Sequence, residues 1–270
     1  MPILPGLYLA LLALGLGWAL RRWYDPVPPR ILALFALAPF LLFGRALIGG
    51  EVLLPLGNLS PVVPYRQLPP SERPGFGLQG DLVRQIAPWQ LEVRRALADG
   101  RWPLWNANAG AGMPLMGDPQ SQSFQPLVMA GYPFDVWAGV GITGALRVLM
   151  ALVFFFLFLR RLGLGEPAAV LGSLGFGLGG FLMLWLGWPM ATSAALLPLG
   201  LYAATRVDDQ GGRRDTFLLY LAGLGLFLGG HPETVVYAPT AALVYQMREV
   251  LLYGRNTRVD RFGEPRFAWR

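Results

Sequence analysis

Residues 137–159 read WAGVGITGALRVLMALVFFFLFL, an apolar run in which Arg147 is the one charged residue. A helix needs roughly 20 apolar residues to cross a bilayer, so this run predicts a membrane-spanning helix. An ionisable side chain at that depth is costly, which makes Arg147 a candidate site residue. Two interpretations stay open. Arg147 holds an anionic lipid phosphate in the outer half of the bundle, or it bonds to a neighbouring helix or snorkels to the surface.

Apolar runs continue on both sides of this stretch, as expected of a chain with 54% hydrophobic and 14% charged residues and a mean hydropathy of +0.45. The sequence therefore predicts an all-α integral membrane protein. We expect two transmembrane helices in 1–49, an extracytoplasmic loop in 50–136, a helical membrane bundle in 137–252 and a basic cytoplasmic tail in 253–270. The predicted spans, about seven in number, lie at about 3–20, 31–49, 137–159, 168–186, 190–205, 215–230 and 234–252.

Arginines predict the orientation of these spans. The net charge of +6 comes from short arginine groups between apolar runs, which indicates membrane flanks and no nucleic-acid partner. The groups are Arg21, Arg22 and Arg30, then Arg160 and Arg161, then Arg206, Arg213 and Arg214. Placing all three loops in the cytoplasm puts the loop at 50–136, the Trp188–Pro189 turn and the turn at 230–233 outside. Cysteine is absent, which excludes disulfides and thiolate metal sites.

The outer loop contains a predicted amphipathic helix at Asp81–Asp99, lying on the membrane, because apolar residues recur there at helical spacing. Pro88 should kink it or split off its first turn, and Gly100 stands where a C-cap glycine would. Asp81 has two interpretations: an N-cap at the helix start, or a general base or charge anchor. Arg84 and Gln85 lie beside it and are candidates to hold phosphate or sugar.

Aromatic and amide side chains follow this helix. Trp105 and Asn106 pair an indole face with an amide, a combination that suits a sugar, and Gln120 and Gln122 add further amides. We take these four as candidate substrate-binding residues. The alternative is that they are ordinary solvated loop residues.

A second polar cluster lies at Gly230-His231-Pro232-Glu233, between the last two predicted spans. His231 and Glu233 offer a proton shuttle, a phosphate contact or two ligands of a metal site, or they simply form a turn. Two ligands alone do not establish a metal, so a divalent ion stays possible without being assigned. We expect this turn to meet the outer loop on the same side of the membrane.

Gly175-Phe176-Gly177-Leu178-Gly179-Gly180 matches a dinucleotide-binding glycine pattern only formally, because it lies inside an apolar span rather than after a strand. Gly175 and Gly179 have the spacing of small residues at a helix–helix contact. The sequence therefore predicts close helix packing here and no nucleotide site.

Five ordered blocks carry a resemblance to a known family. They are GDLVRQIAPW (80–89), GRWPLWNANAGAGMPLMGDPQSQSFQPL (100–127), RRLGLGEPAAVLGSLGFGLGGF (160–181), WPMATSAALLPLGLYAATR (188–206) and GGHPETVVY (229–237). Together they resemble the N-terminal half of the bacterial YfhO-like membrane proteins, relatives of the GT-C glycosyltransferases.

The resemblance implies a multi-pass protein of the bacterial cytoplasmic membrane that transfers a sugar from a polyprenyl-phosphate carrier to an extracytoplasmic acceptor in modification of a cell-envelope glycan, with inversion. Asp81 matches the family's catalytic acidic residue in its first large outer loop. Family members are longer, which suggests a fragment or a partner chain supplying further helices. Their large loop follows the first span and here it follows the second, so either an N-terminal helix is added or the first predicted span does not cross the membrane. A lipid or glycolipid flippase and a non-catalytic assembly subunit are the alternative functions.

Overall fold

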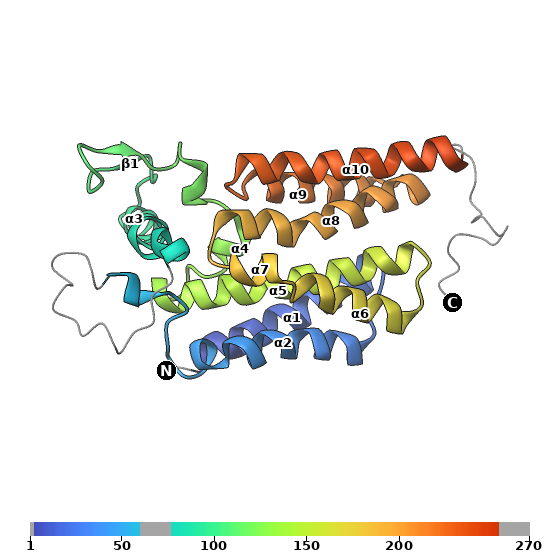
Figure 1. Ribbon diagram of the computed structural model, residues 1–270, viewed down its shortest axis with the longest axis horizontal. Coiled ribbons are helices and arrows are strands. Elements are labelled where there is room, and N and C mark those ends of the chain that lie inside the picture. Colours follow the sequence, from blue (N-terminus) through green and yellow to red (C-terminus); the bar gives the residue numbers. More distant parts are fainter. Residues whose placement is uncertain (1–2, 60–76, 254–270) are drawn as a thin grey trace.

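A computed structural model describes residues 3–59 and 77–253 as a helical bundle with a smaller region covering one of its ends (Figure 1). The bundle contains α1 (Leu4–Trp23), α2 (Pro29–Leu47), α5 (Val136–Arg161), α6 (Glu166–Gly177), α7 (Gly180–Leu184), α8 (Pro189–Gln210), α9 (Arg213–Phe227) and α10 (Pro232–Tyr253). We call residues 51–59 and 77–135 the cap region. It contains η1 (Leu56–Leu59), η4 (Gly77–Gln79), η5 (Leu82–Ile86), α3 (Ala87–Ala98), β1 (Trp105–Asn106), β2 (Met113–Pro114), η6 (Pro119–Ser121) and α4 (Pro126–Met129). The predicted cytoplasmic tail lies outside the described residues apart from Tyr253.

Helix α5 is the centre of the bundle, packing against α1, α2, α6 and α8. In its most apolar 18-residue stretch, 83% of the residues are buried, and apolar side chains lie on every face of the helix. A helix that is hydrophobic all round is stable only when other helices surround it. The apolar run at 137–159 thus lies in the core helix. Asp135 caps the start of this helix by accepting a hydrogen bond from the backbone N–H of Ala138 at 2.9 Å.

Four helical segments within the described residues are long and apolar enough to cross a membrane: Leu4–Trp23, Pro29–Leu47, Val136–Arg161 and Glu166–Leu184. The last of these combines α6 and α7. The apolar windows of the first two are only 28% buried, and leucines such as Leu11 and Leu41 lie exposed on their outer faces. Such large exposed apolar surface suits lipid rather than water. The structure thus supports a helical membrane protein with four candidate membrane-spanning segments among the described residues. The last three predicted spans form α8, α9 and α10, and their crossing of the membrane stays a prediction.

The fourth predicted span is broken into α6 and α7 at Gly177–Gly179. The predicted contact through Gly175 is wrong, because a Cβ on that glycine would meet nothing within 4 Å. Gly177 makes the close contact instead: a Cβ there would lie 2.6 Å from a methyl carbon of Leu152 in α5. Spacing along a helix identifies a stripe of small residues, but which of them faces a neighbour depends on the packing.

The three arginine-rich loops gather at the end of the bundle opposite the cap region (Figure 1). Asp25, in the α1–α2 loop, is central there, because its carboxylate pairs with Arg161 and Arg206 at 2.9 Å each. It also accepts a hydrogen bond from Tyr202 at 2.8 Å, and Arg206 makes a second ion pair with Asp215 at 2.5 Å. We call these five buried residues the ionic cluster. It ties α5, α8, α9 and the α1–α2 loop together.

The predicted amphipathic helix is present, but its environment differs from the prediction. Residues 80–98 are helical without a break: η5 is a π-helical stretch that leads directly into α3, so the predicted split at Pro88 does not occur, and Pro88 lies in the first turn of α3. Gly100, at φ +68°, follows the helix end. The apolar side chains Leu82, Trp89 and Val93 pack with Leu115 of the cap region. The expectation that this face lies on lipid is therefore wrong, because the loop supplies its own small core.

Candidate functional site

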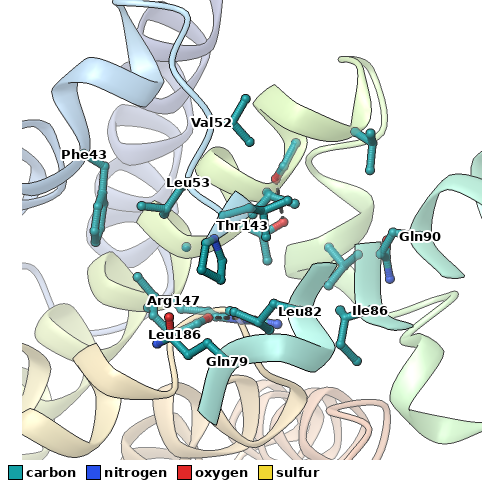
Figure 2. A pocket seen from close by; sticks show the side chains of 18 of the residues that line it. Phe43, Val52, Leu53, Gln79, Leu82, Ile86, Gln90, Thr143, Arg147 and Leu186 are labelled. Atoms are coloured by element: carbon teal, nitrogen blue, oxygen red, sulfur yellow. Dashed lines mark hydrogen bonds between the residues drawn. The ribbon is translucent and has the colours of Figure 1, made fainter. Parts of the chain in front are cut away.

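A cavity of about 420 Å³ lies where the cap region meets α2, α5 and the α7–α8 turn (Figure 2). Its apolar wall includes Phe43, Leu53, Leu82, Ile86, Val140 and Leu186. Its polar lining consists of Gln79, Gln90, Arg94, Gln122, Thr143 and Arg147. No carboxylate is among the described residues that line it. A cavity with an apolar wall and two arginines suits an amphiphilic ligand with an anionic group.

One face of α5 forms a continuous side of this cavity. Gly139, Thr143 and Arg147 follow at four-residue intervals and therefore lie above one another on the helix. The Thr143 hydroxyl is occupied, since it donates to the backbone carbonyl of Gly139 at 2.9 Å. Eight residues of helix separate Gly139 from Arg147, which is about 12 Å along the axis. Arg147 thus lies deep in the cavity relative to the start of α5.

Arg147 is 2% exposed and is held from two sides. One terminal nitrogen donates to the backbone carbonyl of Leu186, and the other donates to Oε1 of Gln122 at 2.9 Å. Its Nε–H has no partner. Within the described residues no carboxylate forms an ion pair with it, whereas Arg161 and Arg206 in the ionic cluster are paired with two carboxylates, Asp25 and Asp215. A buried charge without a counter-ion is unfavourable, so the site is prepared for an anion.

Gln122 orients Arg147 and joins the cap region to the bundle. Its backbone is left-handed, at φ 51° and ψ 32°, directly after η6. Its Nε2 donates to Thr192 Oγ1 at 2.9 Å and to the backbone carbonyl of Gly229 at 2.7 Å. Both ends of the amide are therefore bonded, which fixes the oxygen that Arg147 contacts. The unusual backbone conformation is supported by these tertiary bonds.

Gln90 and Arg94 line the cavity from α3, one helical turn apart. Gln90 Nε2 donates to the backbone carbonyl of Ser121, while its Oε1 has no partner. Arg94 donates to the carbonyl of Phe134 at 2.6 Å, and its Nε has no partner. Neither residue was predicted from the sequence as part of a site. The available signal was two polar residues four apart beside the apolar stripe of the predicted helix.

Arg94 also lies over the ring of Tyr132, with its guanidinium carbon 4.8 Å from the ring centroid. Burial lowers the pKa of Arg94, and the nearby Tyr132 and Asp135 oppose that shift. Burial raises the pKa of Tyr132 to about 12, so its hydroxyl stays protonated and donates to the carbonyl of Ser123 at 2.8 Å. Tyr132 thus acts as a neutral support for the arginine.

Asp81 does not act as a side-chain cap, because its carboxylate accepts no hydrogen bond from the helix start. It is exposed, and two residues close to it in the chain, Gln79 and Leu82, line the cavity. Asp81 itself is not among the residues that line the cavity. Arg84 is also exposed and donates to the carbonyl of Asn58 at 3.1 Å, and Gln85 is half-buried.

Apart from Gln122, the predicted residues of the aromatic and amide segment lie away from the cavity lining. Trp105 is exposed, and its indole covers Gly112, where a Cβ would come within 2.6 Å of the ring. Asn106 is buried and accepts a hydrogen bond from the backbone N–H of Asn108 at 2.9 Å, so it holds the turn between β1 and β2. Gln120 is half-buried.

The turn at 230–233 does meet the cap region, as expected, but through its glycines. Gly229 accepts the hydrogen bond from Gln122, whereas His231 makes a local contact with Thr234 at the start of α10, with Nδ1 3.3 Å from the hydroxyl. Glu233 is exposed in the first turn of α10. Of the predicted site residues, the structure brings Gln122 and Arg147 together at the cavity and leaves the others outside its lining.

Gly230→Ala should disrupt this junction. Gly230 has φ +84°, and a Cβ there would lie 2.5 Å from the backbone carbonyl oxygen of Pro119. We expect a loss of about 1–3 kcal/mol in unfolding free energy, measured by denaturant titration in detergent. Gly223→Ala is the control, because a Cβ there meets nothing within 4 Å and α9 should tolerate it or gain stability. Equal stability of the two variants would contradict the junction.

The described residues include no group of three or more His, Cys, Asp or Glu side chains arranged to hold a metal ion. Comparison with protein-family models, curated proteins and solved structures gave no match for this chain.

Proposed function

We propose that this protein is a glycosyltransferase of the bacterial cytoplasmic membrane that takes its sugar from a polyprenyl-phosphate carrier and works on the outer side. The single observation that supports this most is Arg147, buried in a partly apolar cavity without a carboxylate partner in the part of the chain that the structure describes. A lipid phosphate supplies both missing elements, a counter-ion for the guanidinium and hydrocarbon for the apolar wall. The arginine-rich loops at the opposite end of the bundle support the outer orientation of the cavity.

The proposed chemistry is a direct displacement. The acceptor hydroxyl oxygen attacks the anomeric carbon of the sugar, the bond from that carbon to the phosphate oxygen breaks, and polyprenyl phosphate leaves with the electron pair. Asp81 takes the hydroxyl proton, and Arg147 stabilises the charge that develops on the phosphate. The exposure of Asp81, next in the chain to the lining residue Leu82, supports this division of roles, because the acceptor arrives from water and the donor from lipid.

Asp81→Asn is the direct test of the catalytic assignment. Removing a general base should lower transfer from a labelled polyprenyl-phosphate hexose by roughly 100-fold or more, measured in membranes containing the full chain. Binding of polyprenyl phosphate should persist, because Asp81 does not line the cavity. Asp99→Asn is the control, since Asp99 is an exposed partner of Arg101 in the same region. Undiminished transfer by Asp81→Asn would remove Asp81 from the mechanism.

A transporter or flippase is the competing proposal. It requires a polar path across the bundle, yet the cavity lining ends at Arg147 and the buried ionic cluster fills the opposite end. The two functions differ in their product. A glycosyltransferase releases polyprenyl phosphate and a glycosylated acceptor, whereas a flippase moves an unchanged lipid between leaflets of reconstituted vesicles.

A further inference from the structure

We infer that Gln90 and Arg94 form a subsite for the hydroxyl groups of the transferred sugar, separate from the phosphate site at Arg147. This inference rests on the proposed function and adds which part of the ligand each wall of the cavity recognises.

Unsatisfied polar atoms carry the inference. Among the described residues, three buried side-chain atoms without any hydrogen-bond partner belong to residues that line this one cavity: Gln90 Oε1, Arg94 Nε and Arg147 Nε. Buried polar atoms are normally paired, and leaving one unpaired costs about 1–3 kcal/mol. Three such atoms around one space indicate a ligand that supplies the missing partners. The three atoms are themselves buried, and the side chains that carry them line the cavity.

The chemistry of the α3 pair fits a hydroxyl group. The carbonyl of Ser121 only accepts hydrogen bonds, so the Gln90 atom facing it is the amide nitrogen and the unpaired atom is the oxygen. Gln90 therefore offers an acceptor, and Arg94 offers the Nε–H donor one helical turn away. A hydroxyl both donates and accepts, and a sugar carries several on neighbouring carbons. A phosphate, which only accepts when fully ionised, leaves Gln90 Oε1 unpaired.

The two subsites are well separated. Arg94 lies at the level of Gly139, where a Cβ would come within 2.2 Å of its terminal nitrogen. The backbone of Arg147 is about 12 Å further along α5 than that of Gly139. Figure 2 likewise places Gln90 and Arg147 on opposite sides of the cavity, with Leu82 and Ile86 between them. One phosphate does not reach both positions, whereas a phosphate carrying a sugar extends from one toward the other.

The experiment compares two probes, polyprenyl phosphate and polyprenyl-phosphate glucose, bound to the full chain in nanodiscs. Wild-type protein should bind the glycosylated lipid more tightly than the bare one. Gln90→Met, similar in size, lacks the acceptor and also the donor to Ser121; it should bind bare polyprenyl phosphate as the wild type does and lose roughly tenfold in affinity for the glycosylated lipid. Arg95→Met is the matched control, because Arg95 is an exposed neighbour on α3 and should keep the preference.

An unchanged preference in Gln90→Met overturns the subsite, and so does a wild-type protein that binds both lipids equally, a result that needs no variant to fold. Thermal unfolding of each variant establishes that it is folded before binding is compared. Failure of bare polyprenyl phosphate to bind the wild type overturns the proposed function itself. The two failures are therefore distinguishable.

Discussion

Arg147→Met is expected to weaken binding of polyprenyl phosphate by roughly 30-fold or more, the size of effect seen when one partner of a buried charge pair is removed. Methionine fills a similar space and removes the guanidinium. The stability of the unliganded protein should change by less than about 2 kcal/mol, because two effects oppose each other. Removing an uncompensated buried charge is favourable, while the carbonyl of Leu186 and Oε1 of Gln122 lose a donor. Binding is measured by titration in nanodiscs, and stability by thermal unfolding.

Arg101→Met provides the matched control for that variant. Arg101 belongs to the cap region but is exposed and pairs with Asp99 at the surface. Its replacement should leave binding unchanged, because exposed charges contribute little at physiological salt. If both variants bind alike, the affinity comes from general surface charge and the buried arginine is not the phosphate site.

Asp25→Ala is expected to destabilise the protein by about 3–5 kcal/mol, or to prevent its accumulation as a folded protein. The substitution removes the shared carboxylate of the ionic cluster. Arg161 then stays buried without that counter-ion, and Tyr202 loses its acceptor. Denaturant unfolding in detergent measures the loss.

Asp99→Ala is the comparison for this prediction. Asp99 and Arg101 lie 2.8 Å apart, but both side chains are more than half exposed, so the change should stay within about 0.5 kcal/mol. Similar losses in the two aspartate variants would contradict the view that burial makes the cluster essential. The two ends of the bundle therefore differ. The buried arginines of the ionic cluster are paired with carboxylates of the protein, whereas Arg147 at the cap-region end is left for a ligand.

Local sequence patterns predicted much of the helical architecture. Apolar runs located the helices, Pro88 and Gly100 marked the start and end of α3, and the arginine groups predicted which loops gather at one end. These features depend on neighbours a few residues apart. The contact of Gly177 with Leu152 and the burial of the α3 apolar face against Leu115 were missed, because both depend on tertiary packing.

The site was predicted less completely, for a related reason. Arg147 was recognisable as a charge inside an apolar run, and Gln122 as one glutamine among several. What singles out Gln122 is its left-handed backbone and its bond to Gly229, a contact between residues 107 positions apart. Gln90 and Arg94 are distinguished only by atoms that lack partners in the folded protein. Neither property is visible in the chain before it folds.

The most direct measurement is the magnetic dipolar coupling between the phosphorus of polyprenyl phosphate and isotope-labelled arginine nitrogens, recorded by solid-state NMR on the protein in bilayers. The coupling reports direct contact between the lipid phosphate and a guanidinium. We predict that wild-type protein and Arg101→Met show it and that Arg147→Met does not. A coupling that persists unchanged in Arg147→Met would contradict the assignment of the cavity as the lipid-phosphate site.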